Sequence, residues 1–161
     1  MRFKPVPPAP DDLDGLARVR DAVPLVPGSE TDCCARLIDR AGVPARDEAK
    51  TWLTLLRALE LIERTETGYR RCRRGIDRED LARAFRARVD TAATVLDALD
   101  DEPRDATAVF AAVRATIPDW ERRRSADPEG LYRERVTNLL DWAVLLGLAE
   151  RRDGGYVTAG A

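Results

Sequence analysis

The sequence predicts a mainly α-helical protein with two small β-hairpins, arranged as two similar units in tandem. Three observations support this prediction. Apolar residues recur at helical spacing along most of the chain, two short segments end in a Gly-Tyr hairpin turn, and the second half repeats the first. With 161 residues, 44% of them hydrophobic, the chain is long enough for one or two small domains with cores of ordinary size.

The first unit is predicted to span residues 11–75, after a flexible proline-rich tail over residues 1–10 whose four prolines exclude a helix. We expect three helices in it, over residues 11–23, over 30–41 and from 44 to 59. Ser29 suits the N-cap of the second helix, Gly42 its end, and Pro44 the first turn of the third. A hairpin follows, with strands over residues 61–66 and 69–74.

The second unit, residues 76–161, repeats the ending of the first. A shift of 87 places matches LELIERTETGY to LGLAERRDGGY and aligns seven identical residues within the window 52–69, far more than chance would give. We expect three helices here as well, over residues 78–99, 106–117 and 131–146. About eleven additional residues, 118–128, separate the last two. The helix over 78–99 would be about 33 Å long and would join the two units.

Three helices followed by a two-stranded hairpin resemble the winged helix-turn-helix family. Two patterns carry the resemblance: a helix that runs into Leu-x-Leu-Ile-Glu-Arg (residues 59–64), and a hairpin whose turn ends in Gly68-Tyr69. The resemblance covers about residues 12–75 and 79–158, and the whole chain is similar to small tandem winged-helix proteins of haloarchaea. It implies a DNA-binding, transcription-regulating protein. The insertion interrupts the tight turn of the family pattern in the second unit.

Two groups of side chains in the first unit are candidates for nucleic-acid binding. In winged-helix DNA-binding proteins the polar face of the third helix enters the major groove, and steps of four, four and three residues place one polar stripe on that face here: Arg46, Lys50, Thr54 and Arg57. The second group lies on the outer strand of the hairpin, where guanidinium groups would contact phosphates or a minor groove: Arg70, Arg71, Arg73 and Arg74. The other interpretation is a merely solvated helix face, with the arginines paired to the acids of residues 77–80.

The composition excludes several other classes of function. The chain has no His, so His-dependent triads and His-ligated metal sites are excluded, and no nucleophile is grouped with a base. We therefore expect no catalysis, no cofactor and no metal. No apolar run reaches about 18 residues, and the first ten residues lack the apolar region of a signal peptide, so we expect a cytoplasmic protein without a membrane partner. A predominance of Arg over Lys suggests a high-GC genome, and the 35% charged fraction suits a salty cytosol.

A DNA-binding regulator is the leading hypothesis, and a protein–protein adaptor is the alternative. Tandem winged-helix adaptors similar to segregation and condensation protein B hold partner segments and do not bind DNA directly. The isoelectric point of about 5.4 and the interrupted turn of the second unit favour this alternative. An adaptor should present an apolar groove and a DNA-binding protein a basic stripe. The amphipathic helix over 78–99 also offers a seam for a homodimer.

Three further features carry weaker hypotheses. The insertion combines Trp120 with the arginines 122–124, which would clamp single-stranded nucleic acid; the favoured interpretation is that the indole is buried and closes the loop. Cys72 lies among arginines that would lower the pKa of an exposed thiol, as in a redox sensor, whereas Cys34 has the spacing of a core residue. The acidic residues between 97 and 105 would bind a cation or are simply solvated.

Overall fold

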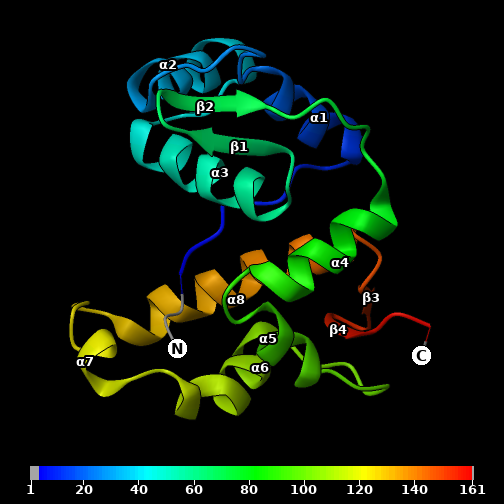
Figure 1. Cartoon of the computed structure of the whole chain (residues 1–161). Helices are drawn as coiled ribbons and strands as arrows, with labels where there is room; N and C mark the ends of the chain where they lie inside the picture. The colour runs from blue at the N-terminus through cyan, green and yellow to red at the C-terminus, as the bar shows by residue number, and fades with distance from the viewer. Residues whose placement is uncertain (1–3, 161) are drawn as a thin grey trace. The chain divides into compact units, whose positions relative to one another are not determined.

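The computed structural model describes residues 4–160 and divides into two units (Figure 1). The first unit comprises residues 10–77, and the second comprises residues 78–160 together with residues 4–9. Each unit ends in one antiparallel two-stranded hairpin, and the rest of the regular structure is helical. The predicted fold class, mainly α with a small hairpin in each of two units, is confirmed.

In the first unit three helices precede the hairpin: α1 (Leu13–Asp21), α2 (Glu30–Ala41), α3 (Arg46–Ala58), β1 (Ile62–Thr65) and β2 (Gly68–Arg71). The Ser29 hydroxyl accepts a hydrogen bond from the backbone N–H of Asp32, and Gly42 ends α2 at a φ of 71°, both as predicted. Pro44 lies before the N-cap Ala45, so α3 begins two residues later than expected. Side chains from all three helices form the core: Leu16, Val19, Cys33, Cys34, Leu37, Leu53 and Leu56.

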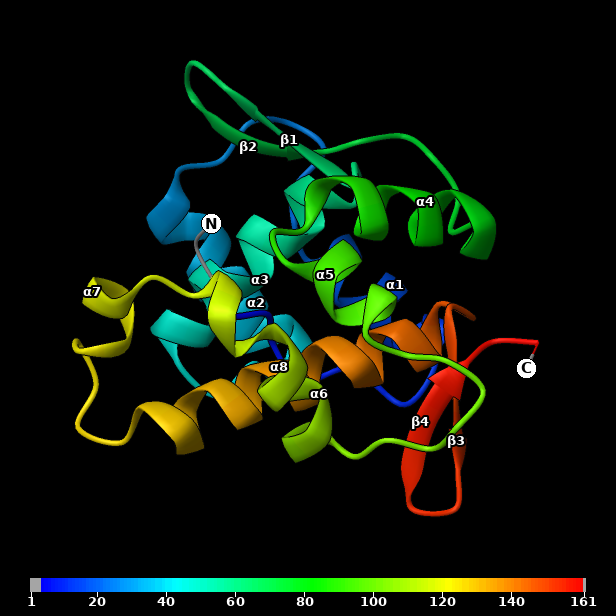
Figure 2. The same cartoon turned by 90° about the horizontal axis from the view of Figure 1, so that it is seen from below.

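The second unit contains more helices, followed by its hairpin: α4 (Arg78–Arg88), α5 (Ala92–Asp97), α6 (Ala106–Val113), the 3₁₀ helix η1 (Arg114–Thr116), α7 (Asp119–Arg122), α8 (Pro128–Leu145), β3 (Ala149–Arg152) and β4 (Gly155–Thr158). Helices α5 and α6 pack against α8 (Figure 2). The core is built from large side chains of these helices: Phe85, Val109, Phe110, Tyr132, Leu139 and Trp142. The short helix α7 lies within the predicted insertion.

The predicted single helix over residues 78–99 is wrong, because the chain breaks it into α4 and α5. Thr91 adopts a left-handed conformation with a φ of 68°, which no continuous α-helix of L-residues can contain. The break lets α5 bury Ala92, Val95 and Leu96 in the core. Asp90 and Thr91, at the break, are weak helix formers, so the local preference for a continuous helix is small here. The burial of α5 therefore decides the conformation. The helix that would have offered a 33 Å dimer seam is therefore absent.

A pair of backbone hydrogen bonds ties each hairpin to a segment that precedes a helix, α2 in the first unit and α6 in the second. Gly28 and Tyr69 exchange two such bonds of 2.9 and 2.8 Å, and Arg104 and Tyr156 exchange two of 3.1 and 2.9 Å. Arg104 lies 76 positions after Gly28, whereas Tyr156 lies 87 positions after Tyr69. The two units are therefore structural repeats, and the second has eleven more residues between these two points.

The close backbone approach at these bridges requires glycine in the hairpins. A Cβ atom on Gly68, whose φ is 142°, would lie 2.0 Å from the carbonyl oxygen of Gly28. A Cβ atom on Gly155 would lie 2.8 Å from the backbone nitrogen of Arg104. The Gly-Tyr pattern is thus the sequence signal of a third backbone segment beside the hairpin.

The proline-rich N-terminal segment packs on the second unit, where the sequence predicts a flexible tail. Val6 and Pro7 are buried, and the indole Nε1 of Trp142 donates a 2.7 Å hydrogen bond to the carbonyl oxygen of Pro7. Asn138 Nδ2 donates to the carbonyl oxygen of Val6 at 3.3 Å. Prolines exclude a helix but hold the chain extended, which suits a segment that lies along α8. We call residues 4–9 the N-terminal strap. Residues 1–3 of the predicted tail lie outside the described residues.

Replacing Val6 with Asp should release this strap, because a carboxylate cannot be buried against α8 without a partner. We expect the V6D variant to lose about 2 kcal/mol of the free energy of unfolding of the second unit, close to the value of burying one valine. Urea unfolding followed by tryptophan emission measures this loss. The matched variant P8D, at an exposed position of the same segment, should change it by less than about 0.5 kcal/mol. Equal effects of the two variants would show that the strap adds nothing to the core.

Replacing Gly68 with Ala should destabilise the first unit by about 2–4 kcal/mol, because the methyl group must displace Gly28 and break both bridging hydrogen bonds. The control is Gly75→Ala in the same unit, where a Cβ atom meets nothing within 4 Å and no positive φ is required. That variant should change the free energy of unfolding by less than about 0.5 kcal/mol. Denaturant unfolding of both variants gives the comparison, and similar losses would contradict the close approach.

Candidate nucleic-acid interface

The predicted polar stripe of α3 lies on the exposed face of that helix. The opposite face is buried by Ala49, Trp52, Leu53 and Leu56, and this fixes the rotation of α3 about its axis. All four predicted residues are consequently exposed: Arg46, Lys50, Thr54 and Arg57. Their side chains are only lightly restrained, since Arg46 Nη2 reaches Thr31 Oγ1 at 3.4 Å and Thr54 Oγ1 donates to the backbone oxygen of Lys50. The stripe can therefore reorient towards a ligand.

The first hairpin brings the predicted arginines next to acids of its own unit. In the β1–β2 register Arg70 lies opposite Glu63, and the two side chains form an ion pair. Arg71 Nη1 lies 3.2 Å from Asp21 Oδ1, and Arg74 Nη1 lies 3.4 Å from Glu60 Oε2. Three of the four arginines are thus paired, and these three partners come from α1, from the residue after the C-cap of α3 and from β1.

These ion pairs restrain the arginines without removing them from the surface. Burial alone would raise the pKa of Asp21, but hydrogen bonds and charge from Arg20 and Arg71 outweigh it and lower the pKa. Half of the Arg70 side chain and 38% of the Arg74 side chain remain exposed. Exposed pairs of this kind contribute about 0–1 kcal/mol, so a phosphate can replace the carboxylate. Arg73 is exposed and forms no ion pair with another residue of the described chain.

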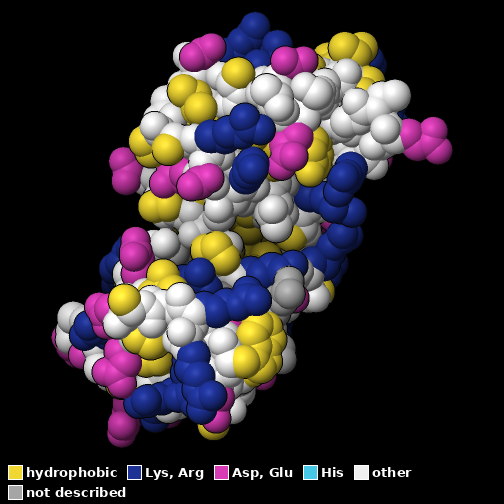
Figure 3. All heavy atoms as spheres, turned by 90° about the vertical axis from the view of Figure 1, so that its left-hand side faces the viewer, with side chains coloured by type: hydrophobic (Ala, Val, Ile, Leu, Met, Phe, Trp, Pro, Cys, Tyr) yellow, Lys and Arg dark blue, Asp and Glu magenta, His cyan; other side chains and the backbone are white. Residues whose placement is uncertain are grey.

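The surface of the first unit therefore carries both signs of charge. In Figure 3, where this unit occupies the upper part of the view, Lys and Arg side chains are interspersed with Asp and Glu side chains. Asp47 and Glu48 occupy the first turn of α3, where their negative charges interact favourably with the positive end of the helix dipole and stabilise the helix. The cationic part of α3 consequently extends from Lys50 to Arg57.

The second unit does not reproduce this surface. At the offset of 87 positions, the α3 stripe corresponds to Arg133, Thr137, Asp141 and Val144 on α8. The residues matching Arg70, Arg71 and Arg73 are Val157, Thr158 and Gly160. Only one of these seven positions keeps a cation.

A carboxylate of α8 holds the second hairpin instead. Asp141 Oδ1 accepts a 2.7 Å hydrogen bond from Tyr156 Oη and another of 2.7 Å from Arg151 Nη2. Burial together with the hydrogen bond to Asp141 raises the pKa of Tyr156 to about 12, so the phenol stays protonated and donates. Asp141, on the face of α8 that matches the candidate reading face of α3, is thus engaged by the second unit's own hairpin. The sequence contains the signal, since the 87-residue shift aligns Asp141 with the neutral Thr54. The significance of this added negative charge becomes clear only once the hydrogen bonds of Asp141 are known.

The predicted redox character of Cys72 is not supported by its surroundings. Burial raises the pKa of the Cys72 thiol, and Glu63 adds to this effect, more than Arg70 and Arg74 lower it. The expectation of a lowered pKa is therefore wrong, because it considered the neighbouring arginines but neither the burial of the thiol nor the nearby acids. Cys34 is buried as predicted, and so is its neighbour Cys33.

The structure also describes the two remaining candidates, Trp120 of the insertion and the acidic residues between 97 and 105. The indole of Trp120 is 51% exposed, so the favoured interpretation, in which it is buried and closes the inserted loop, is wrong. In the acidic segment Asp97 pairs with Arg86 at 2.6 Å, Asp100 pairs with Arg104 at 2.6 Å, and Asp105 caps α6. Among residues 4–160 no group of three or more Cys, Asp or Glu side chains is arranged to hold a metal ion. No helix of that range has the length and apolar character needed to cross a membrane.

Comparison with known proteins agrees with this architecture. The family model that matches the chain describes a halobacterial double winged helix domain and covers residues 1–161. No curated protein and no solved structure shows a significant match to the chain. The resemblance to tandem winged-helix proteins of haloarchaea is thereby confirmed, and the two hairpins are the wings of the two repeats. The chain belongs to the family of halobacterial double winged helix domains.

Proposed function

We propose that the protein is a cytoplasmic, non-catalytic transcriptional regulator whose first unit binds duplex DNA through α3 and the first wing. By the first wing we mean β1, β2 and residues 72–74. One observation carries the proposal: the exposed cationic side chains of α3 and of this wing lie in one unit, and the matching positions of the second unit have lost almost all of them.

The proposed mode of binding follows from the geometry of α3. A major groove about 12 Å wide admits one helix, and the exposed side chains from residue 50 to residue 57 would face its floor and edges. Lys50 and Arg57 would contact phosphates or guanine edges, and Thr54 would contact a base edge or a thymine methyl group.

The first wing would bind the phosphate backbone of the DNA beside the major groove. Arg73 is exposed and has no carboxylate partner among the described residues, so it can take a phosphate at little cost. Arg70, Arg71 and Arg74 would exchange their carboxylates for phosphates on binding. The two bridging hydrogen bonds between Gly28 and Tyr69 fix the wing relative to α2.

Binding to a generic duplex, followed by fluorescence anisotropy over a series of KCl concentrations, tests this proposal. The affinity of the full chain should fall with salt, with a slope of about 0.9 for each phosphate contacted by a cation that has no carboxylate partner. Changing Arg70, Arg71, Arg73 and Arg74 together to Gln should abolish binding. The double variant K50Q/R57Q should weaken it and lower the slope by about two, if both side chains contact phosphates.

The matched control is the double variant R123Q/R133Q, which removes two exposed cations from the second unit. It should leave affinity and slope unchanged, because the proposed interface lies in the first unit alone. Absence of binding at every salt concentration at which the protein is folded would overturn the proposal, and so would equal losses in the two double variants.

An adaptor function is the second candidate, and one observation favours it. Leu25 and Val26, in the loop between α1 and α2, are 46% and 72% exposed, which is unusual for large aliphatic residues beside a structured hairpin. If the duplex does not bind, changing both to Ser and measuring the capture of a protein partner is the next experiment. Loss of a partner from the L25S/V26S variant would support the adaptor function.

A further inference from the structure

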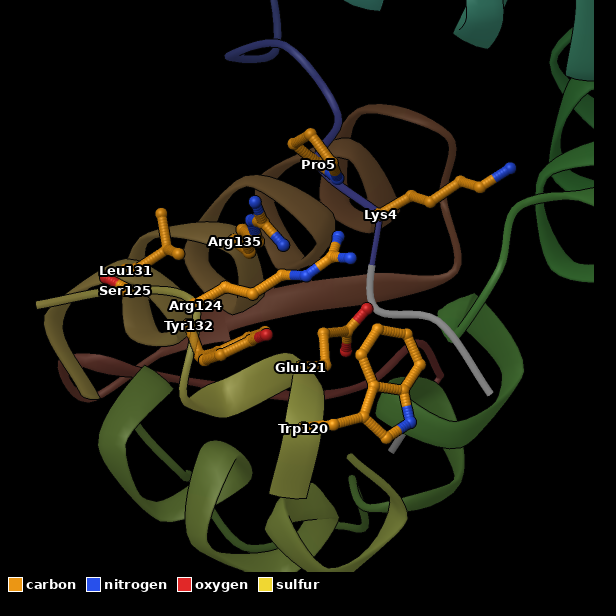
Figure 4. A pocket seen from close by; sticks show the side chains of 9 residues that line it. All are labelled: Lys4, Pro5, Trp120, Glu121, Arg124, Ser125, Leu131, Tyr132 and Arg135. Carbon is orange, nitrogen blue, oxygen red and sulfur yellow. The ribbon is translucent and has the colours of Figure 1, made fainter. Parts of the chain in front are cut away.

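A cavity of about 330 Å³ opens in the second unit between the N-terminal strap, the inserted segment and the start of α8 (Figure 4). The insertion supplies Trp120, Glu121, Arg124 and Ser125, the strap supplies Lys4 and Pro5, and α8 supplies Leu131, Tyr132 and Arg135. Its size is at the lower end of the range for small-ligand sites. The first unit has no matching cavity wall, because it lacks the insertion.

The charge of the cavity favours an anion. Three cationic side chains, Lys4, Arg124 and Arg135, line it together with one carboxylate, that of Glu121. Burial and a hydrogen bond with Glu121 raise the pKa of the Tyr132 phenol, so this carboxylate is already engaged with a wall of the cavity. The ammonium group of Lys4 lies 3.9 Å from Asp90, a separation that leaves it only loosely held. The two guanidinium groups are therefore the principal anion-binding groups.

The aromatic walls favour a ligand that also carries a flat ring. The Arg124 guanidinium lies 5.2 Å from the centroid of the Trp120 ring, and the Arg135 guanidinium lies 5.3 Å from that of Tyr132. Figure 4 shows the Glu121 carboxylate between Tyr132 and the indole of Trp120, with both guanidinium groups above the two rings in this view. Tyr132 is fixed from behind by stacking on Phe110 at 6.1 Å, whereas half of Trp120 is exposed. A half-exposed indole next to an arginine is the arrangement on which nucleobases stack.

We propose that this cavity binds a nucleotide, with its base stacked on Trp120 and its phosphate held by Arg124 and Arg135. The shared chemistry is a nucleobase that carries a phosphate, and two sources supply it: a free mononucleotide or the terminal nucleotide of a single strand. Bidentate guanidinium–phosphate hydrogen bonds hold the anion, and the indole accepts any base because every base has a flat face. The site lies within the second unit, so it does not depend on duplex binding by the first.

Isothermal titration of the full chain with AMP, adenosine and inorganic phosphate tests whether the base and the phosphate are both needed. AMP should bind at least about tenfold more tightly than either fragment, since each fragment lacks one of the two contacts. Tryptophan emission locates the site: Trp52 and Trp142 are 5% and 0% exposed, so quenching by AMP reports on Trp120.

Matched variants distinguish AMP binding in the cavity from a general attraction of AMP to the positive charges of the surface. Arg124→Gln and Trp120→Leu should each weaken AMP binding about tenfold. Arg123→Gln removes the same charge one residue away, from an exposed side chain outside the cavity, and should change the affinity less than twofold. Circular dichroism of each variant establishes that the second unit is folded.

A 5′-phosphorylated hexadeoxyadenylate distinguishes the two sources. If it binds at least tenfold more tightly than AMP and loses this affinity in Trp120→Leu, the ligand is a strand end; if it binds no better than AMP, the ligand is a free nucleotide. The proposal is overturned if neither compound binds at millimolar concentration, or if Arg123→Gln weakens binding as much as Arg124→Gln. The two proposals can fail separately, because the nucleotide site lies in the second unit and the proposed duplex interface in the first. Variants of the first unit that lose duplex binding should still bind AMP.

Discussion

The bridge between each wing and the segment before α2 in the first unit, or before α6 in the second, is the constraint on which the arrangement of both units depends. Gly28 and Tyr69 in one unit, and Arg104 and Tyr156 in the other, exchange two backbone hydrogen bonds. A wing of two four-residue strands is too small to be stable alone, and the bridge adds a third backbone to it. It also fixes the direction of the hairpin relative to the second helix. Side chains far apart in the sequence, such as Asp21 and Arg71, are thereby brought within hydrogen-bond distance.

The same scaffold carries different surfaces in the two repeats. In the first unit, position 54 is a Thr on an exposed cationic face; in the second, the matching Asp141 binds Arg151 and Tyr156 of its own wing. The eleven additional residues of the second unit do not disturb the core, since α8 still carries buried Leu139 and Trp142. They build a cavity wall instead. The two proposals made above assign these two differences to two ligands: duplex DNA on the exposed cationic face of the first unit, and a nucleotide in the cavity of the second.

Local sequence signals predicted the parts of the fold that local physics controls. Ser29 and Gly42 bound α2 because a side-chain cap and a left-handed residue are decided within one turn. The polar stripe of α3 followed from the spacing of its apolar residues. The break at Thr91 and the packing of Val6 on α8 were missed, because both depend on burial against segments far away in the sequence. The pairing of Arg71 with Asp21 and the raised pKa of Cys72 were missed for the same reason.

The pairing of the wing arginines with acids bears on how such a surface would work in concentrated salt. At 1 M salt the Debye length is about 3 Å, so only groups in direct contact attract one another. When an arginine exchanges a carboxylate for a phosphate, DNA releases a cation and the freed carboxylate collects one. The net release is smaller than for an unpaired cation, and the affinity falls less steeply with salt. Arg70, Arg71 and Arg74 would then hold DNA with a shallow salt dependence, while Lys50, Arg57 and Arg73 account for most of the slope. An acid-paired basic surface is therefore a way to bind a polyanion where a purely basic one would lose its advantage, and it is compatible with an isoelectric point of about 5.4.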